Sequence, residues 1–207
     1  MDMMIVSADG VGHTATVLQT VRPDAPVVLC LPAMGASADY YQPFAQAIAA
    51  AELASAVLLD LRGQGRSTAR ARNGHQFGYR EILELDLPKA ISLLRHVFHG
   101  SRLYVAGHSL GGQLGLLCAG RPDVQVDGLV LIAAGTSHVG AWSGQERAWA
   151  RGMAAGIGVA ARLLPWYPGS RLGFGGDQPR RMMRDWGRVT REDVYAPEGS
   201  DYDYERA

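Results

Sequence analysis

The chain has 207 residues, of which 47 % are hydrophobic and 19 % are charged, so it can bury one sizeable core and its composition excludes a mainly disordered protein. Twenty basic and twenty acidic residues give a formal net charge of zero, which argues against a nucleic-acid binder. The first residues, MDMMIVSADGVGH, lack the layout of a signal peptide, and no apolar run reaches the roughly 18 residues of a membrane span. We therefore expect a cytoplasmic protein without a membrane-spanning segment.

The first part of the chain predicts strands and helices in alternation. Turn-favouring residues at 9–12 between two strand-like runs predict a hairpin. Apolar runs then alternate with amphipathic segments at the spacing of right-handed crossovers, which predicts an α/β fold: a mostly parallel sheet with helices on both faces. We expect strands in residues 3–10, 13–21, 25–32, 55–63, 102–107 and 126–135, and helices in residues 39–53, 79–99 (kinked at Pro88) and 109–120.

The pattern changes at about residue 136. Residues 136–207 contain helical periodicity, prolines and glycines but no convincing strand, and we interpret them as a helical cap, incomplete as it stands, on a core formed by residues 1–135. The apolar cluster at 163–167 is expected to pack on the core, with contact to an acyl chain as the alternative.

A G-x-S-x-G motif occupies Gly107–Gly111, between a predicted strand and a predicted helix. A sharp turn at this point gives the serine a positive φ and leaves no room for side chains two residues to either side. The turn lifts the hydroxyl above the carboxyl ends of the strands and aims the first amides of the helix at the same point. We therefore expect Ser109 to be a nucleophile and the Leu110 N–H to stabilise an oxyanion.

With this motif the chain resembles the α/β-hydrolase family. Two further segments match: the loop Pro32–Gly35, which follows a buried strand, and Asp60–Ser67, which is similar to the family's D-x-R-G-x-G-x-S segment. The Met-Gly pair in the loop resembles the serine aminopeptidase-like branch. The resemblance implies that the Met34 backbone N–H is the second oxyanion donor, that Asp60–Ser67 is a structural turn, and that a small-molecule acyl compound is the substrate. It implies no cofactor and no metal.

A catalytic base is missing from this pattern. The family order is serine, then an acid, then a histidine, but His138 is the only histidine after Ser109. The strands that carry the acid and the histidine in the family are not found, so we expect an incomplete domain without the C-terminal strands. Fluorophosphonate labelling of Ser109 should then be weak or absent. We expect His138 to be a cap-hinge residue.

The other histidines give no better base. His108 precedes the serine on the turn, and we expect its ring to pack beneath the turn. His75 is placed in a loop on the same rim. His96 and His99 have a spacing that can hold a metal, but no further ligand is near in sequence, and we expect a solvated helix end.

Three functions fit these observations. The leading one is a serine hydrolase acting on an ester, amide or thioester; the alternatives are an acyltransferase on the same fold and a catalytically inactive binding or interaction module. The apolar strand GLVLIAAG (128–135) has the composition of an interior strand. Without an outer neighbour it becomes an edge, so we expect marginal stability or self-association through that edge.

Overall fold

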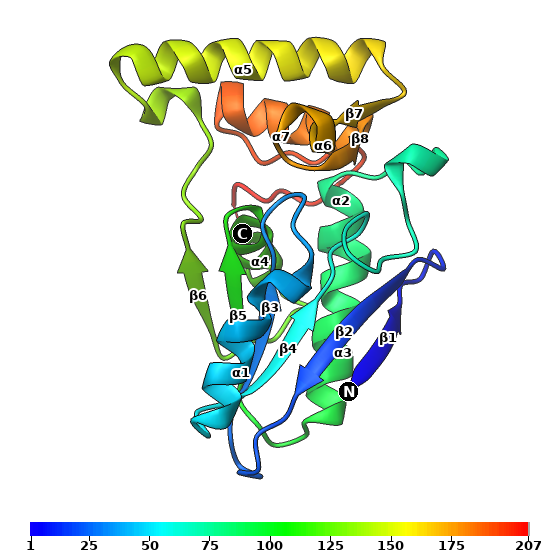
Figure 1. The fold of residues 1–207 in the computed structure, drawn as a ribbon, viewed down its shortest axis with the longest axis vertical. Coiled ribbons are helices and arrows are strands. Elements are labelled where there is room, and N and C mark those ends of the chain that lie inside the picture. Colours follow the sequence, from blue (N-terminus) through cyan, green and yellow to red (C-terminus); the bar gives the residue numbers. More distant parts are fainter. Residues whose placement is uncertain (207) are drawn as a thin grey trace.

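Six strands form the central sheet of the computed structural model, which describes residues 1–206. Their order is β1-β2-β4-β3-β5-β6 (Figure 1). Strands β4, β3, β5 and β6 run parallel to one another, whereas β1 and β2 form the predicted antiparallel hairpin on one edge and β2 pairs antiparallel with β4. The sheet confirms the predicted mostly parallel α/β fold. The strands are β1 Asp2–Val6, β2 Gly12–Leu18, β3 Val27–Leu31, β4 Ser55–Leu59, β5 Leu103–His108 and β6 Gly128–Ile132.

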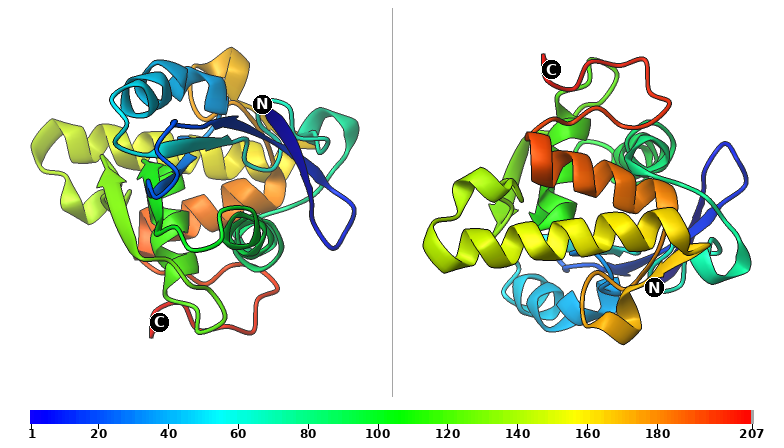
Figure 2. Two further views of the ribbon diagram at one scale, coloured as in Figure 1. Left: turned by 90° about the horizontal axis from the view of Figure 1, so that it is seen from below. Right: turned by 90° about the horizontal axis from the view of Figure 1, so that it is seen from above.

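Helices cover both faces of the sheet (Figure 2). Helix α1 (Gln42–Ala50) lies on one face, and α3 (Leu87–Val97) and α4 (Leu110–Ala119) lie on the other. Side chains of the inner strands are almost wholly buried, as two-sided coverage requires. The serine at position 37 caps the turn before α1, because its Oγ accepts from the Asp39 N–H at 3.2 Å.

The helix predicted at residues 79–99 is irregular before the expected kink at Pro88. The short helix α2 (Tyr79–Glu81) passes into a π-helical turn (Ile82–Asp86) before α3 begins. Proline in the first turn of α3 lacks the N–H that would continue the regular ladder. The turn buries the Asp86 carboxylate, which accepts two hydrogen bonds from Arg62, at 2.9 and 2.6 Å.

The cap elements lie over the carboxyl ends of the parallel strands (Figure 1). They include the helices α5 (Gly144–Leu163), α6 (Gly169–Leu172) and α7 (Arg180–Glu192). The expectation that this segment has no strand is wrong, because β7 (Trp166–Pro168) and β8 (Asp177–Pro179) pair antiparallel. Each has only three residues and ends in a proline, too short for a visible alternation. Among residues 1–206, no helix combines the length and hydropathy needed to cross a membrane.

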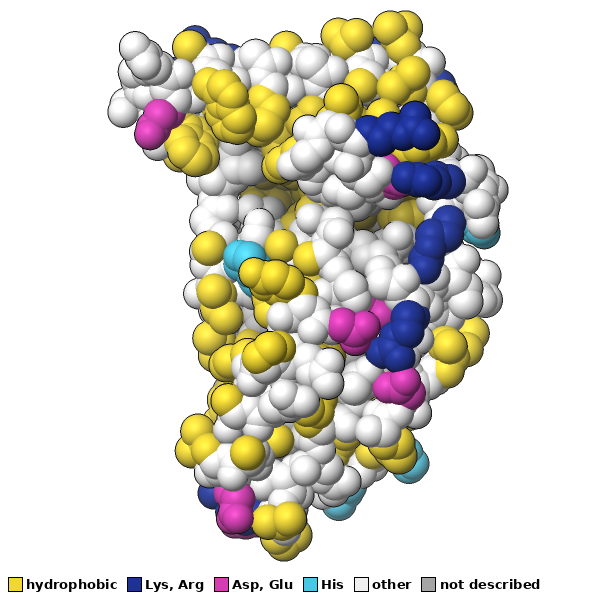
Figure 3. All heavy atoms as spheres, viewed as in Figure 1, with side chains coloured by type: hydrophobic (Ala, Val, Ile, Leu, Met, Phe, Trp, Pro, Cys, Tyr) yellow, Lys and Arg dark blue, Asp and Glu magenta, His cyan; other side chains and the backbone are white. Residues whose placement is uncertain are grey.

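Strand β6 forms the other edge of the sheet, and in the described part of the chain it pairs only with β5. Val130, Leu131 and Ile132 are 49 %, 47 % and 44 % exposed. Figure 3 shows apolar side chains gathered along this side of the molecule. The apolar strand is therefore an exposed edge within the described residues, as its sequence predicts.

Candidate active site

Ser109 lies in the tight turn that joins β5 to α4. Its φ and ψ are 51° and −121°, a conformation that a non-glycine residue adopts only under strain. The Ser109 N–H donates to Ile132 O at 2.9 Å, so the turn is tied to the end of β6. The backbone thus has the strained form that the motif predicts.

The three glycines around this serine are required by close contacts. A Cβ on Gly107 would lie 2.3 Å from the Gly112 Cα, and a Cβ on Gly111 would lie 2.5 Å from the carbonyl oxygen of Leu31. A Cβ on Gly112 would meet that of Ala134 at 2.4 Å. Helix α4 therefore packs against β3, β5 and the end of β6 at distances that admit no side chain.

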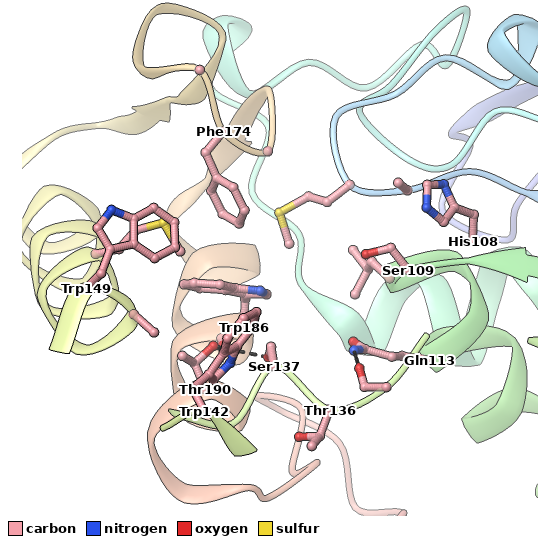
Figure 4. A pocket seen from close by; sticks show the side chains of 18 residues that line it. His108, Ser109, Gln113, Thr136, Ser137, Trp142, Trp149, Phe174, Trp186 and Thr190 are labelled. Carbon is pink, nitrogen blue, oxygen red and sulfur yellow. Dashed lines mark hydrogen bonds between the residues drawn. The ribbon is translucent and has the colours of Figure 1, made fainter. Parts of the chain in front are cut away.

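Ser109 opens into a cavity of about 510 Å³ between the sheet and the cap (Figure 4). Met34 and Leu110, the two predicted oxyanion donors, line the same cavity, so the fold brings the three predicted site residues together. No Asp, Glu, Lys or Arg contributes to its wall, as far as residues 1–206 define it. The large apolar and aromatic side chains on the cap side are Trp142, Trp149, Met153, Phe174 and Trp186.

The polar groups at the serine are unpaired. Neither the Met34 N–H nor the Leu110 N–H donates to an acceptor within residues 1–206, and Ser109 Oγ has no hydrogen-bond partner there. Free backbone donors at the start of a helix and in a loop are suited to bind a developing negative charge. Two residues that line the cavity with Ser109 thus have backbone donors without an acceptor among the described residues.

His108 does not pack beneath the turn as expected; it lies between two cavities. It lines the cavity of Ser109 and also a second, apolar hollow of about 280 Å³ beside Ile132. Its Nδ1 lies 2.7 Å from Tyr41 Oη, which also accepts from the Ala33 N–H at 3.1 Å. Burial raises the pKa of Tyr41, which keeps the phenol protonated and able to donate to His108 Nδ1. His108 is therefore engaged in holding Tyr41.

The remaining histidines lie away from the serine. His138 begins the turn at Val139–Ala141 and does not line the cavity; its Nδ1 is buried without a partner among the described residues. His75 bonds through Nδ1 to the Arg70 backbone. His96 lies in the last turn of α3. Within residues 1–206 there is no group of three His, Cys, Asp or Glu side chains that could hold a metal.

Hydrogen bonds connect residues 135–137, which follow β6, to α4 on one side and to the end of α7 in the cap on the other. Gln113 Nε2 donates to Gly135 O at 2.6 Å, and Thr136 Oγ1 donates to Asp193 Oδ1 at 2.5 Å. Ser137 and Thr190 share a bond of 3.2 Å between their hydroxyl oxygens. This segment therefore fixes the end of α7 above the serine.

The turn after β4 carries a buried network of charges. The Asp60 carboxylate accepts from the backbone N–H groups of Ala38, at 2.9 Å, and Arg66, at 2.8 Å. Arg62 bridges Asp86 and Asp9, with a shortest distance of 2.6 Å to each. Burial opposes ionisation of Asp86, but its hydrogen bonds from Arg62 lower the pKa of that carboxyl overall.

Sequence reasoning missed two features of this site. Gln64, in the same turn, is 5 % exposed and reaches the loop that contains Met34. The second is the aromatic wall of the cavity, to which the cluster at 163–167 does not contribute: Tyr167 packs in the core, as expected, and Leu163 is 74 % exposed. The only sequence signal for Gln64 was its position between two glycines in the turn.

The fold and the turn at Ser109 are those of an α/β hydrolase. The family model "Serine aminopeptidase, S33" matches residues 22–189, and the chain belongs to this family. No curated protein matches the chain.

Solved structures agree on the fold. A hydrolase from Pseudomonas aeruginosa superposes with a TM-score of 0.52 at 18 % identity, over 84 % of this chain and 62 % of that one. The bottromycin epimerase BotH, in complex with bottromycin A2, superposes with a TM-score of 0.55 at 19 % identity, over 83 % of this chain and 59 % of BotH. A putative lipase from Acinetobacter baumannii superposes with a TM-score of 0.52 at 19 % identity, over 66 % of this chain and 42 % of the lipase. The chain thus spans less than two thirds of the length of each.

Proposed function

We propose that the protein is a serine hydrolase in which Ser109 attacks the carbonyl carbon of an ester, amide or thioester. A base takes the proton of Ser109 Oγ while the Oγ–C bond forms and an electron pair moves onto the carbonyl oxygen. The N–H groups of Met34 and Leu110 stabilise this oxyanion. The bond to the leaving group then breaks, the leaving group takes the proton, and water releases the acyl group.

One observation carries the proposal: a strained serine lines the same cavity as two residues whose backbone N–H groups have no acceptor within residues 1–206. Strain of this kind costs about 1–3 kcal/mol and concentrates at functional sites. Each oxyanion donor typically contributes about 3 kcal/mol to transition-state stabilisation.

The cavity wall favours an acyl group that is uncharged and apolar. Its large side chains are aromatic or sulfur-containing, and no carboxylate, ammonium or guanidinium group of residues 1–206 lines it. A charged acyl group would lose its hydration there without gaining an ionic partner. An ester of a neutral aliphatic or aryl acid is therefore the best first substrate.

A second candidate is a binding module that performs no chemistry. It is favoured by the lack of any hydrogen bond to Ser109 Oγ within residues 1–206, and by the engagement of His108 Nδ1 with Tyr41. Under this hypothesis the cavity binds an apolar ligand and Ser109 remains unmodified. The two candidates differ in whether a base supplied from solution activates Ser109.

Imidazole supplies such a base. Hydrolysis of p-nitrophenyl butyrate is measured with increasing imidazole, whose ring is small enough for the cavity of about 510 Å³. Because general-base catalysis contributes about 100-fold or more, imidazole should raise turnover by the protein well above that by Ser109→Ala at the same concentration. The rate measured with Ser109→Ala gives the hydrolysis by imidazole in solution, which is subtracted from the rate of the unaltered protein.

Ser137→Ala is the matched control, because this second hydroxyl lines the same cavity. It should retain the imidazole-dependent turnover. Equal rates for the unaltered protein and Ser109→Ala, together with binding of the uncleaved ester, would reject the hydrolase and leave the binding module.

A further inference from the structure

The side chain of Gln64 contacts the loop that contains Met34. It extends from the turn after β4 into a position where two carbonyl oxygens and one N–H face its amide. With the nitrogen toward the carbonyls, Gln64 Nε2 donates to Ala33 O at 3.1 Å and to Ala36 O at 2.6 Å, and Oε1 accepts from the Gly35 N–H at 3.3 Å. The amide therefore uses both its donors and its acceptor on one loop.

These bonds leave one free donor in the loop. The Ala33 N–H donates to Tyr41 Oη, the Gly35 N–H to Gln64, and the Ala36 N–H to Ala33 O. The Met34 N–H is the remaining amide, and it has no acceptor within residues 1–206. Among the backbone N–H groups of Ala33 to Ala36, only that of Met34 therefore has no acceptor within residues 1–206.

The direction of that N–H follows from peptide geometry. The Ala33 carbonyl and the Met34 N–H belong to the same planar trans peptide, so they point in opposite directions. Gln64 Nε2 and the Ala36 N–H both hold Ala33 O. A rotation of this peptide that turned the Met34 N–H away from the cavity would break both bonds.

Glycines of the cap contact the Met34 loop on the side opposite Gln64. Gly35 has φ +79°, and a Cβ there would lie 2.4 Å from the carbonyl carbon of Gly175 and 2.5 Å from Gly176 N. A Cβ on Gly175 would lie 2.9 Å from Met34 Sδ. The loop is therefore held between Gln64 and the glycines of the cap.

We propose that Gln64 is the positioning residue of the oxyanion site: it orients the Ala33–Met34 peptide so that the Met34 N–H points into the cavity beside Ser109. The proposal rests on the proposed function, since it assigns Gln64 to the same reaction. Gln64 acts through the backbone and does not touch the reacting atoms.

Gln64→Glu is the sharpest variant. It keeps the size of the side chain and the acceptor for Gly35, but replaces two donations by repulsion between a carboxylate and two carbonyl oxygens. We expect the imidazole-dependent acylation of Ser109 to fall about 100-fold, the usual effect of losing one oxyanion donor. The dissociation constant for butyramide, an uncharged unreactive analogue, should change less than about twofold, because ground-state binding does not use the donor.

A structural readout separates this proposal from the proposed function. In a Ser109→Ala background, methionine labelled with ¹⁵N reports the Met34 amide, which Met34→Leu assigns among the seven methionines. Gln64→Glu should shift the Met34 resonance. Ser67→Ala is the matched control, because its Oγ accepts from the Gly63 N–H in the same turn without touching the Met34 loop. It should leave Met34 unshifted.

An unmoved Met34 resonance in Gln64→Glu, or equal shifts in Gln64→Glu and Ser67→Ala, would overturn the positioning role. If Gln64→Glu does not fold, Gln64→Met removes the same bonds without adding a charge and receives the same two measurements. Failure of Ser109 to react in the unaltered protein would reject the proposed function, whereas the Met34 resonance would still test the positioning of the peptide.

Discussion

The two sides of Ser109 are built very differently. On the oxyanion side, the Met34 loop is held by Gln64, by Tyr41 and by the cap glycines. On the side of β6, the described residues place an exposed apolar edge and an open hollow, and no group there bonds to Ser109 Oγ. In the proposed mechanism, backbone groups of residues 1–206 therefore stabilise the negative charge, whereas no side chain of residues 1–206 is bonded to Ser109 Oγ to remove its proton.

This contrast follows from where each function is encoded. The proposed oxyanion donors are backbone groups in turns that follow the paired strands β3 and β5, so their positions depend on the backbone of neighbouring strands. A general base is a side chain, and in the family order it comes from a strand far along the chain from the serine. Three predictions test this comparison. They ask whether the Met34 loop is rigid and whether the edge of β6 is free of a strand partner.

The largest effect is expected for Asp86, which anchors the turn that carries Gln64. Asp86→Ala leaves Arg62 buried without its main partner and should lower the free energy of unfolding by about 3 kcal/mol at pH 7. The folded state lowers the pKa of this carboxyl, so its stabilisation is complete above the unfolded pKa of about 4 and is lost as the pH falls through the lower folded pKa.

Urea denaturation at pH 7 and at decreasing pH values measures this difference. The gap between the unaltered protein and Asp86→Ala should shrink at acidic pH. Asp24→Ala is the control, because its carboxylate is 84 % exposed, and it should change stability by less than about 0.5 kcal/mol. A constant gap from pH 7 to pH 2 would show that the charge of Asp86 is not its source.

The next effect concerns the contact between the cap and the oxyanion loop. Gly35→Ala places a methyl group against the backbone of Gly175 and Gly176 and should reduce imidazole-dependent acylation about 100-fold by displacing the Met34 N–H. Gly74→Ala has the same left-handed backbone strain, with φ +85°, but nothing within 4 Å of the added methyl group.

Both alanine variants should lose about 1 kcal/mol of stability from left-handed backbone strain, and Gly35→Ala should lose more because its methyl group meets the backbone of the cap. Only Gly35→Ala should lose acylation. Equal acylation rates in the two variants would mean that the cap contact does not hold the loop, and the oxyanion side would then be less rigid than the contacts suggest.

The smallest effect is expected at the β6 edge. If this edge mediates self-association, Val130→Lys should weaken association at least about tenfold, because a charged side chain on an edge strand opposes strand pairing. Val97→Lys is a matched control, since both valines are 49 % exposed and Val97 lies at the end of α3. Sedimentation velocity over a range of concentrations measures the difference, and a concentration-independent monomer for the unaltered protein would remove the β6 edge as an interface.

The sequence predicted those parts of the fold that depend on near neighbours in the chain. The strand, turn and helix around Ser109 follow from an apolar run, glycines two residues to either side and a helix start, all within Val105–Gly115. The hairpin and the parallel strands follow in the same way from local patterns. Met34 was placed through its resemblance to a known loop.

The features that escaped prediction depend on contacts between distant segments. Gln64 bonds to residues about thirty positions earlier, and nothing in its own neighbourhood indicates that reach. The wall of the cavity joins Trp142 to Trp186 across the cap, and the strands β7 and β8 are too short to show a pattern. Burial and pairing of this kind are properties of the folded chain and leave no periodic signal.

The proposed function requires a reactive hydroxyl at the strained turn of Ser109. Its most direct test is labelling with a fluorophosphonate in the presence and absence of imidazole, with the adduct located by mass spectrometry of peptides. We predict slow labelling without imidazole, a marked acceleration with it, and an adduct on Ser109 that is absent in Ser109→Ala. Labelling that imidazole does not accelerate, or an adduct on another residue such as Ser137, would contradict the account.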